Sequence, residues 1–484
     1  MQNTALAVVS SAETVFFKRV AEPLVAAAGP VLCQQVLVTI ANHGPAPVAG
    51  RVAIAAAGDT VVTRLEIAPG VAEYACFGPT LWPHKAPEAA ALVSLYAEGV
   101  VHEATTPLGH HRPWTYFLLS DTCTDCTWVY DSEDDVRRAD AALTAAELDL
   151  AERLAGGPHR QESHYNFVHA REAEYFVEIY PEQADRLYDH VRRGTITLNP
   201  IYNMAITCAM SLEELIRQLY PARALALKEG LDIGYANHQE TPTIAWIMAT
   251  VLAESGVGHL VKSILPYECP WAARLEEPPI FIWEGPDGSR VLVRRRNTDY
   301  VEGRFVLKGL RATNSALHDQ IAPAYEALGD DYPFDAIALI GCYGDLDGVS
   351  GDAPARKAAT IAAYRAQGWD YPRLVDASHK QFWDAIEAQI AARGISLAVV
   401  NGDHGASWDA WPACLAHDAA GWRRAQERAA TADKLAAIAA SLEPDWLRDH
   451  KPGLDQGWRN LIYLADHAWN GANDANRELN ARLR

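Results

Sequence analysis

The chain has 484 residues, of which 49% are hydrophobic and 21% are charged, so it holds enough apolar material for two or three globular domains. Its formal net charge of -20 argues against a protein that wraps a nucleic-acid backbone, because that function needs clustered lysine and arginine. An acidic surface of this kind is compatible with neutral substrates such as sugars.

The N-terminal stretch MQNTALAVVSSAETVFFKRV does not have the basic segment that precedes the apolar part of a secretory signal. No stretch is long and apolar enough to span a bilayer, so we expect no membrane partner. Eight cysteines in so long a chain are not a disulfide framework. We therefore expect a cytoplasmic protein with reduced thiols. A homo-oligomer is compatible with the sequence, which does not fix the oligomeric state.

Short runs of alternating apolar residues fill the segment 30–106, and turn signals such as NHGP (42–45) and PG (69–70) separate them. Short strands at this spacing predict a small antiparallel β-sandwich. We assign residues 1–108 to this domain and expect it to have an accessory role, because no titratable residues cluster there.

After a linker, GHHRP (109–113), apolar strand-like runs alternate with helical patterns up to residue 410. Strands are predicted at 116–120, 195–203, 231–236, 259–265 and 334–341, and helices at 133–155, 171–193 and near 243–254, with a capping box at Ser211 and Glu214. Such alternation indicates an α/β domain with a parallel sheet, either open or closed into a barrel. In both cases the loops after the strands form the site. Residues 411–484 are rich in Ala, Leu and Arg and predict a helical bundle.

The stretch SDTCTDCTW (120–128) follows the first of these strands. The pair Cys123 and Cys126 has the spacing of a redox motif, but Asp125 between them would raise a thiol pKa. A structural zinc site would need a second pair of ligands, and the other cysteines of this region are isolated. A third interpretation is that Cys123 and Asp125, which point to one side of an extended segment, share a metal; Asp121 belongs to the same alternation.

Three later polar loops also follow predicted strands. Carboxylates in such loops suit general acid–base chemistry, and exposed aromatic rings beside them suit carbohydrate binding. A solvated turn is the alternative interpretation of each loop. The loops are YANHQETPTIAW (235–246) with His238 and Glu240, GCYGDLDGVSGD (341–352) with Asp345 and Asp347, and NGDHGASWDAW (401–411) with Asp403, His404 and Trp408. A further segment, YLADHAWNGAND (463–474), contains His467 beside residues that are unusual in a plain bundle helix.

In this order the motifs resemble glycoside hydrolase family 38, the alpha-mannosidases, over residues 113–484. The most specific local match is FIWEGPDGSRVLV (281–293), which resembles an aromatic-rich hairpin of the family. Cys123, Asp125 and Trp128 stand where the family has a His-x-Asp pair followed by an aromatic residue. Glu240 stands at the acidic position of a turn before a helix, GCYGDLDG resembles a Gly-Asp-Gly loop, and ADHAWNG resembles the late segment with a zinc-ligating His.

The resemblance implies a seven-stranded β/α barrel (113–410) followed by a helical bundle (411–484), with zinc at the barrel mouth in contact with sugar hydroxyls. In the family the metal is held by the His and Asp of the first motif, by the nucleophilic Asp and by the late His. Asp125 and His467 match this set, and Cys123 replaces the His. Because a thiolate is a good zinc ligand, we expect Zn²⁺ or another divalent metal at Cys123, Asp125 and His467.

The resemblance places the nucleophilic Asp before the helix EELIRQL (213–219), where NPIYNMAITCAM (199–210) contains no carboxylate. Three functions follow: a metal-dependent enzyme acting on a glycoside by a non-standard mechanism, a glycosidase whose nucleophile comes from another loop, or a non-catalytic carbohydrate-binding protein. The expected partner is a small-molecule or oligosaccharide substrate. The candidate catalytic residues are Asp345, Asp347, Glu240 and Asp403, and the candidate substrate-binding residues are Trp128, His238, His404, Trp408 and Asn203.

Overall fold

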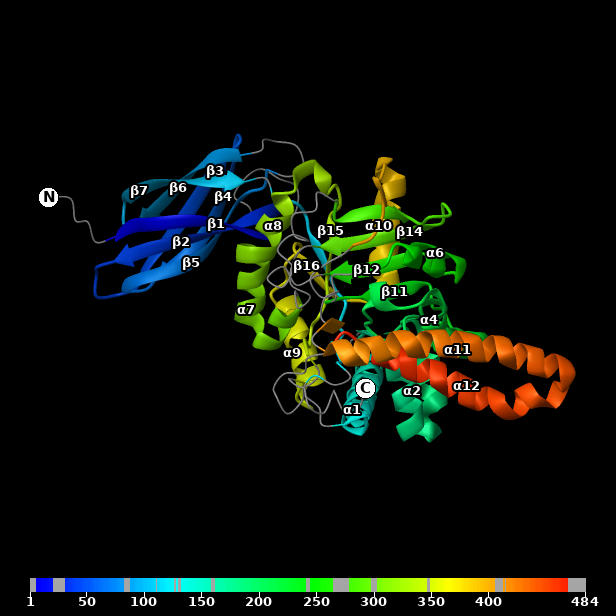
Figure 1. The fold of residues 1–484 in the computed structure, drawn as a ribbon. Coiled ribbons are helices and arrows are strands. Elements are labelled where there is room, and N and C mark those ends of the chain that lie inside the picture. Colours follow the sequence, from blue (N-terminus) through cyan, green and yellow to red (C-terminus); the bar gives the residue numbers. More distant parts are fainter. Residues whose placement is uncertain are drawn as a thin grey trace. The chain divides into compact units, whose positions relative to one another are not determined.

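The structure of the protein, a computed structural model, describes residues 6–20, 31–81, 88–109, 111–125, 128, 132–157, 162–240, 244–263, 278–296, 303–345, 349–404, 412–413 and 415–468 (Figure 1). The chain separates into two compact units. Unit 1 comprises 1–116, 308–337 and 360–375, and unit 2 comprises 117–307, 338–359 and 376–484. This division differs from the three consecutive domains predicted from the sequence, which stay a prediction.

Unit 1 contains the β-sandwich that the sequence predicts. One sheet has the strand order β1-β2-β5 and the other β4-β3-β6-β7, and all neighbouring strands are antiparallel. Alternate residues such as Val36, Val38, Val52 and Ile54 point inward and are fully buried between the sheets. The strands are β1 (Leu6–Val20), β2 (Val31–Asn42), β3 (Val48–Ala56), β4 (Asp59–Ile67), β5 (Gly70–Pro79), β6 (Glu88–Ala97) and β7 (Val100–Gly109).

The long first strand lies outside the segment 30–106 from which we predicted the sandwich. Strand β1 pairs with β2, and its register shifts between Val8 and Ser10 and again between Glu13 and Phe17. Each irregularity interrupts the alternation of inward and outward residues on which a strand prediction depends. The apolar pattern of this segment is therefore hard to recognise as a strand.

The end of β1 is hydrogen-bonded to the segment 360–375 of the same unit. The backbone N–H of Phe17 donates to the carbonyl of Tyr371 over 2.7 Å, and Arg19 pairs with Asp370 over 2.5 Å. The remaining helical segments of this unit are α7 (Leu310–Ser315), the π-helical η5 (Ala316–Ile321), α8 (Ala322–Glu326) and η6 (Gly329–Asp331).

Unit 2 contains a five-stranded sheet in the order β11-β12-β14-β13-β17. Strands β11, β12 and β14 are parallel neighbours, β13 is antiparallel to β14, and β17 is parallel to β13. The motif FIWEGPDGSRVLV forms the hairpin of β13 and β14, whose turn is closed by the Gly285 N–H donating to the Ser289 carbonyl. The bounds are β11 (Tyr235–His238), β12 (His259–Ser263), β13 (Ile280–Glu284), β14 (Arg290–Arg296) and β17 (Val399–Asn401).

The other described strands form two smaller, separate sheets. The predicted seven-stranded barrel is therefore not confirmed. One has the order β15-β8-β16 and the other pairs β9 and β10 in parallel. Among the described residues these sheets are separate and no closed barrel is found. What the structure shows is a mixed α/β fold. The bounds are β8 (Thr115–Leu118), β9 (Tyr165–Asn166), β10 (Ile196–Thr197), β15 (Ala336–Leu339) and β16 (Arg373–Asp376).

Helices form in the predicted segments 133–155, near 243–254 and after Ser211. Ser132 caps the first helix by accepting from the Asp135 N–H, and Ser211 and Glu214 form the expected capping box. The single helix predicted over 171–193 is wrong, because Pro181 cannot continue a helix and splits it into two. The bounds are α1 (Glu133–Ala155), α2 (Ala170–Ile179), η1 (Pro181–Gln183), α3 (Ala184–Arg193), η2 (Thr207–Ala209), α4 (Leu212–Arg217), α5 (Tyr220–Glu229), α6 (Ile247–Glu254), η4 (Arg304–Lys308), α9 (Ala353–Ala366), α10 (His379–Arg393), α11 (Ala416–Leu442) and α12 (Pro444–Leu464).

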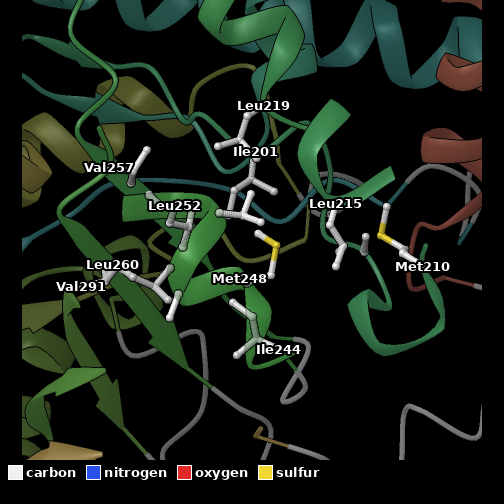
Figure 2. Close-up of a cluster of buried hydrophobic side chains, with 14 of the residues drawn as sticks. Ile201, Met210, Leu215, Leu219, Ile244, Met248, Leu252, Val257, Leu260 and Val291 are labelled. Atoms are coloured by element: carbon white, nitrogen blue, oxygen red, sulfur yellow. The ribbon is translucent and has the colours of Figure 1, made fainter. Parts of the chain in front are cut away.

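The helical hairpin of α11 and α12 shares one hydrophobic core with the five-stranded sheet. Met248 of α6, Leu260 of β12 and Val291 of β14 lie in this core, part of which is shown in Figure 2. Trp422 of α11 and Trp458 of α12 are buried in the same cluster. This packing fixes the end of α12 against the sheet. No helix in the described part of the chain has both the length and the apolarity needed to cross a membrane.

Candidate metal centre

Four side chains with metal-ligand chemistry converge in unit 2, although they lie far apart in the sequence. Cys123 and Asp125 belong to the loop after β8, Glu240 follows β11, and His467 follows α12. One donor atom of each lies within 4.8 Å of all the others, and all four residues are buried or nearly so. Three of them are the ligands expected from the sequence, and Glu240 joins them.

Three of the distances within this cluster match those between the ligands of a tetrahedral cation. His467 Nε2 lies 3.3 Å from Asp125 Oδ1 and 3.3 Å from Glu240 Oε2, and Cys123 Sγ lies 3.4 Å from Asp125 Oδ1. A zinc ion with bonds of about 2.0–2.3 Å separates its ligand atoms by roughly 3.3–3.6 Å. Cys123 Sγ is closer to Glu240 Oε2, at 2.6 Å, which is a thiol–carboxylate hydrogen bond. The sulfur, nitrogen and oxygen donors of the cluster are those that zinc accepts.

Backbone contacts hold His467 in place. Its Nδ1 lies 3.1 Å from the Met204 carbonyl, and its own N–H donates to the same carbonyl over 3.0 Å. A proton on Nδ1 that is donated to this carbonyl leaves Nε2 as the metal-binding atom. Asp466 is also fully buried, and its Oδ1 lies 3.6 Å from Nδ1. The ring is therefore oriented before any ligand binds.

Glu240 has a backbone conformation that side chains other than glycine rarely adopt. Its φ is +64°, in the left-handed region, and only 8% of the residue is exposed. Strain of this kind persists where the surroundings over-determine it, often at functional sites. Here it directs the carboxylate toward Cys123 and His467.

Negative charge and burial together shift the pKa values of the cluster. Burial, with the nearby carboxylates of Glu240 and Asp125, raises the pKa of the Cys123 thiol well above its usual range. Burial also raises the pKa of Asp125 to about 8, although His467 opposes this shift. For His467 burial favours the neutral ring, but Asp125 and Glu240 overcome this and raise its pKa to about 10. Without a metal, an imidazolium therefore carries the positive charge.

The buried carboxylate of Asp121 connects the loops that carry the cluster. Its two oxygens accept from the Gly341 N–H over 2.5 Å and from Asn237 Nδ2 over 3.1 Å, and its carbonyl accepts from the Tyr343 N–H. Gly341 precedes the Asp345 loop, and Asn237 lies three residues before Glu240. Asp121 was predicted only as part of the metal-binding alternation; the structure gives it these positioning contacts.

The remaining candidate residues lie in different surroundings. Asp345 forms a β-bridge with Cys123, and its charge contributes to raising the pKa of Cys123 and Asp125, so its carboxylate lies near the cluster. His238 is also near, because His467 contributes to lowering its pKa, after burial and Lys262. Asp347 and Trp408 lie outside the described residues.

Other predicted residues have contacts that suit a structural role. Asp403 accepts from the Trp246 N–H at the start of α6 over 2.6 Å, and Asn203 donates to the Ile462 carbonyl over 2.9 Å. His404 is buried beside the rings of Phe281 and Trp283, and Trp128 is half-buried. Their roles in substrate binding or catalysis stay predictions.

One further buried network was not predicted from the sequence. Lys357 Nζ lies 3.1 Å from Glu147 Oε2 and 3.7 Å from Asp376 Oδ2, and it donates to the His164 carbonyl over 3.2 Å. The Tyr343 hydroxyl donates to Glu147. Tyr343 is two residues before Asp345, so this network helps to fix the position of the loop that contains Asp345.

Comparison with known proteins shows a likeness in structure alone. The sequence matches no family model and no curated protein. An alpha-mannosidase from Enterococcus faecalis V583 is similar in structure, with a TM-score of 0.56 and 14% identity, over 76% of this chain and 41% of that chain. A glycosyl hydrolase family 38 protein from Enterococcus faecalis has a TM-score of 0.49 and 13% identity, over 77% of this chain and 40% of that chain. The chain thus spans about two fifths of the length of these proteins, and over three quarters of its own length it has a fold similar to that of a bacterial alpha-mannosidase.

Proposed function

We propose that the protein is a metal-dependent enzyme that cleaves a glycoside or a related sugar derivative. The observation that carries the proposal is the convergence of Cys123, Asp125, Glu240 and His467 from three separate segments into one buried cluster. We assign one divalent cation to this cluster, with zinc preferred because of the thiolate and imidazole donors. When bound, the cation would act as a Lewis acid toward a sugar hydroxyl or carbonyl.

Glu240 is the residue that we propose as the nucleophile. The resemblance to family 38 implies a nucleophilic carboxylate that is also a metal ligand, and Glu240 is the carboxylate that accompanies Asp125 in the cluster. Asn199, the first polar residue of the segment 199–210 that lacks a carboxylate, does not take this role, because its side chain is an amide and donates to the Asn237 carbonyl over 2.7 Å. This assignment favours a glycosidase whose nucleophile comes from another loop over a non-standard mechanism.

Asp345 is the residue that we propose as the general acid and base. In the first step, the Glu240 carboxylate would attack the anomeric carbon while the glycosidic C–O bond breaks and Asp345 protonates the leaving oxygen. In the second step, Asp345 would take a proton from a water that attacks the same carbon and releases Glu240. Two displacements of this kind retain the anomeric configuration.

The proposal is tested by assaying the purified protein, loaded with zinc, on a panel of aryl glycosides that begins with an alpha-mannoside. We expect Glu240→Gln and Asp345→Asn to lose at least about 100-fold in kcat, as removal of a nucleophile or a general acid does. Asp345→Asn should keep its zinc, whereas Asp125→Ala should lose it. Asp384→Asn is the matched control, because that carboxylate is exposed on α10 and pairs with Lys380, and it should keep both zinc and turnover.

The mechanism and the alternative function give different results in the same assay. Retention with a glycosyl ester that can be trapped on Glu240 supports the assignment, and net inversion overturns it. Stoichiometric zinc together with sugar binding but no turnover of any glycoside would show the carbohydrate-binding protein instead.

A further inference from the structure

The outer face of the β4-β3-β6-β7 sheet in unit 1 carries two arginines directly opposite each other. Arg64 of β4 is the register partner of Arg51 of β3, and Arg51 is in turn the partner of Tyr96 of β6. Both arginines are exposed. Like charges at directly opposed positions of a sheet are destabilising, so the stability of the sandwich does not explain the pair.

Neither guanidinium has an acidic partner within the described part of the chain, although the protein as a whole carries a net charge of -20. The Arg51 guanidinium lies over the Tyr96 ring, 4.7 Å from its centre. This cation–π contact holds the guanidinium on the sheet face, so less of its freedom is lost when an anion binds. Glu98, in a left-handed conformation with φ of +50°, lies in the same region.

The two arginines line a shallow hollow of about 530 Å³. Small residues, among them Ala49, Gly50 and Gly99, line it together with Tyr96 and the two arginines. The hollow is large enough for a sugar unit and is open along the sheet. Its polar walls offer planar guanidinium groups, which bind carboxylates through paired hydrogen bonds.

We propose that this face of the sandwich binds an acidic polysaccharide, with the carboxylate of a uronic acid unit between Arg51 and Arg64. Two guanidinium groups against the single carboxylate of Glu98 leave a positive balance among the lining residues, which supports an anion, and the choice of a polysaccharide rests on the proposed function in glycoside chemistry. A nucleic acid or an anionic membrane fits less well, because either needs many cationic contacts and the chain is strongly acidic. The sandwich would then bind the polymer on which the same chain acts.

The test measures binding of the full chain to soluble polygalacturonate, with neutral dextran as the comparison polymer, by affinity electrophoresis at fixed salt. We expect polygalacturonate alone to retard the protein, and Arg51→Ala/Arg64→Ala to bind at least tenfold more weakly. The matched control is Arg138→Ala, another exposed arginine, on α1, which should bind like the wild type. Because the substitutions relieve repulsion, the double variant should unfold at no lower temperature than the wild type.

Three results would overturn the proposal: equal retardation by dextran, equal binding to single-stranded DNA at the same salt, or full binding by the double variant. Turnover of small aryl glycosides is measured separately on the same preparations. Binding without turnover would refute the proposed function and leave the polysaccharide site supported. Turnover without binding would refute the polysaccharide site and leave the proposed function supported.

Discussion

Unit 2 buries two clusters of charged side chains that differ in the source of their positive charge. In one, the Lys357 ammonium faces the carboxylates of Glu147 and Asp376, so the chain supplies its own permanent cation. In the other, the described cation beside Asp125, Glu240 and the Cys123 thiol is His467, which is positive because Asp125 and Glu240 raise its pKa to about 10. The first cluster is complete as folded, whereas the second can exchange a proton for a metal ion. Buried acids that are paired with a lysine thus form a structural network, whereas buried acids without such a permanent cation form a candidate metal site.

The largest effect is expected from removing the permanent cation. Lys357→Met leaves Glu147 and Asp376 buried without a counter-charge, and breaking a buried pair in this way costs about 3–5 kcal/mol of the free energy of unfolding. Denaturant unfolding of the two proteins measures the difference. The control is Lys380→Met, which removes an exposed lysine paired with Asp384 and should cost less than about 0.5 kcal/mol. Equal losses in the two variants would show that the buried network does not depend on its lysine.

The second cluster should respond to metal instead. At a free zinc concentration about 100 times Kd, binding to the folded state alone adds about 2.7 kcal/mol to the free energy of unfolding. Thermal unfolding with zinc and with a chelator measures this difference, which Asp125→Asn should abolish and Asp403→Asn should leave intact. Because each variant is compared with itself, a general loss of stability does not affect the result. A wild type that unfolds at the same temperature in zinc and in chelator would rule out the metal centre.

The thiol sharpens the assignment of ligands within this cluster. When cobalt(II) replaces zinc, a coordinated thiolate gives a sulfur-to-cobalt charge-transfer band in the near ultraviolet, and we expect this band in the wild type. Cys123→His should still bind cobalt, because imidazole is an equally suitable ligand, but it should lose the band. Cys208→Ser, which changes an exposed thiol, should keep it. A band that survives in Cys123→His would assign the thiolate to another cysteine.

The sequence predicted the parts of the site that a short motif contains. Cys123 and Asp125 are two residues apart on an extended segment, so the local sequence could propose both as ligands, and the resemblance to family 38 added His467. Glu240 was proposed as an acid or base, and its place beside His467 depends on how β11 and the end of α12 pack, which no local pattern encodes. Lys357 was missed for the same reason, because a lysine in α9 looks exposed until Glu147 and Asp376 are seen beside it.

The fold was predicted to a similar extent. Alternation along β2 and β3 predicted the sandwich, and the Ser211 capping box predicted the start of α4, because both signals are local. The irregular register of β1 concealed that strand, and the closure of a barrel depends on strand neighbours that are distant in sequence. The described sheets show which neighbours are formed, and they do not close.

A third cluster, in unit 1, has a cation that pH alone can remove, and it should give the smallest effect. His111 lies 2.9 Å from Glu326 Oε2 and 3.5 Å from Glu13 Oε2. Burial favours the neutral ring, but these two carboxylates raise the pKa of His111 to about 9, above its usual value of about 6.5. A raised pKa stabilises the fold below pH 6.5, and this contribution is lost as the pH rises from 6.5 through 9.

We expect a loss of about 1–2 kcal/mol over that range, which is less than the full shift would give because the three side chains are partly exposed. Unfolding of wild type and His111→Gln between pH 6 and pH 9.5 measures it as the part of the pH dependence that disappears in the variant. If both proteins lose stability in parallel, His111 is not the titrating cation. If the stability of the variant no longer changes over this pH range, the His111 cluster is intermediate in character between the other two. Its positive charge is then present at neutral pH and is removed at higher pH.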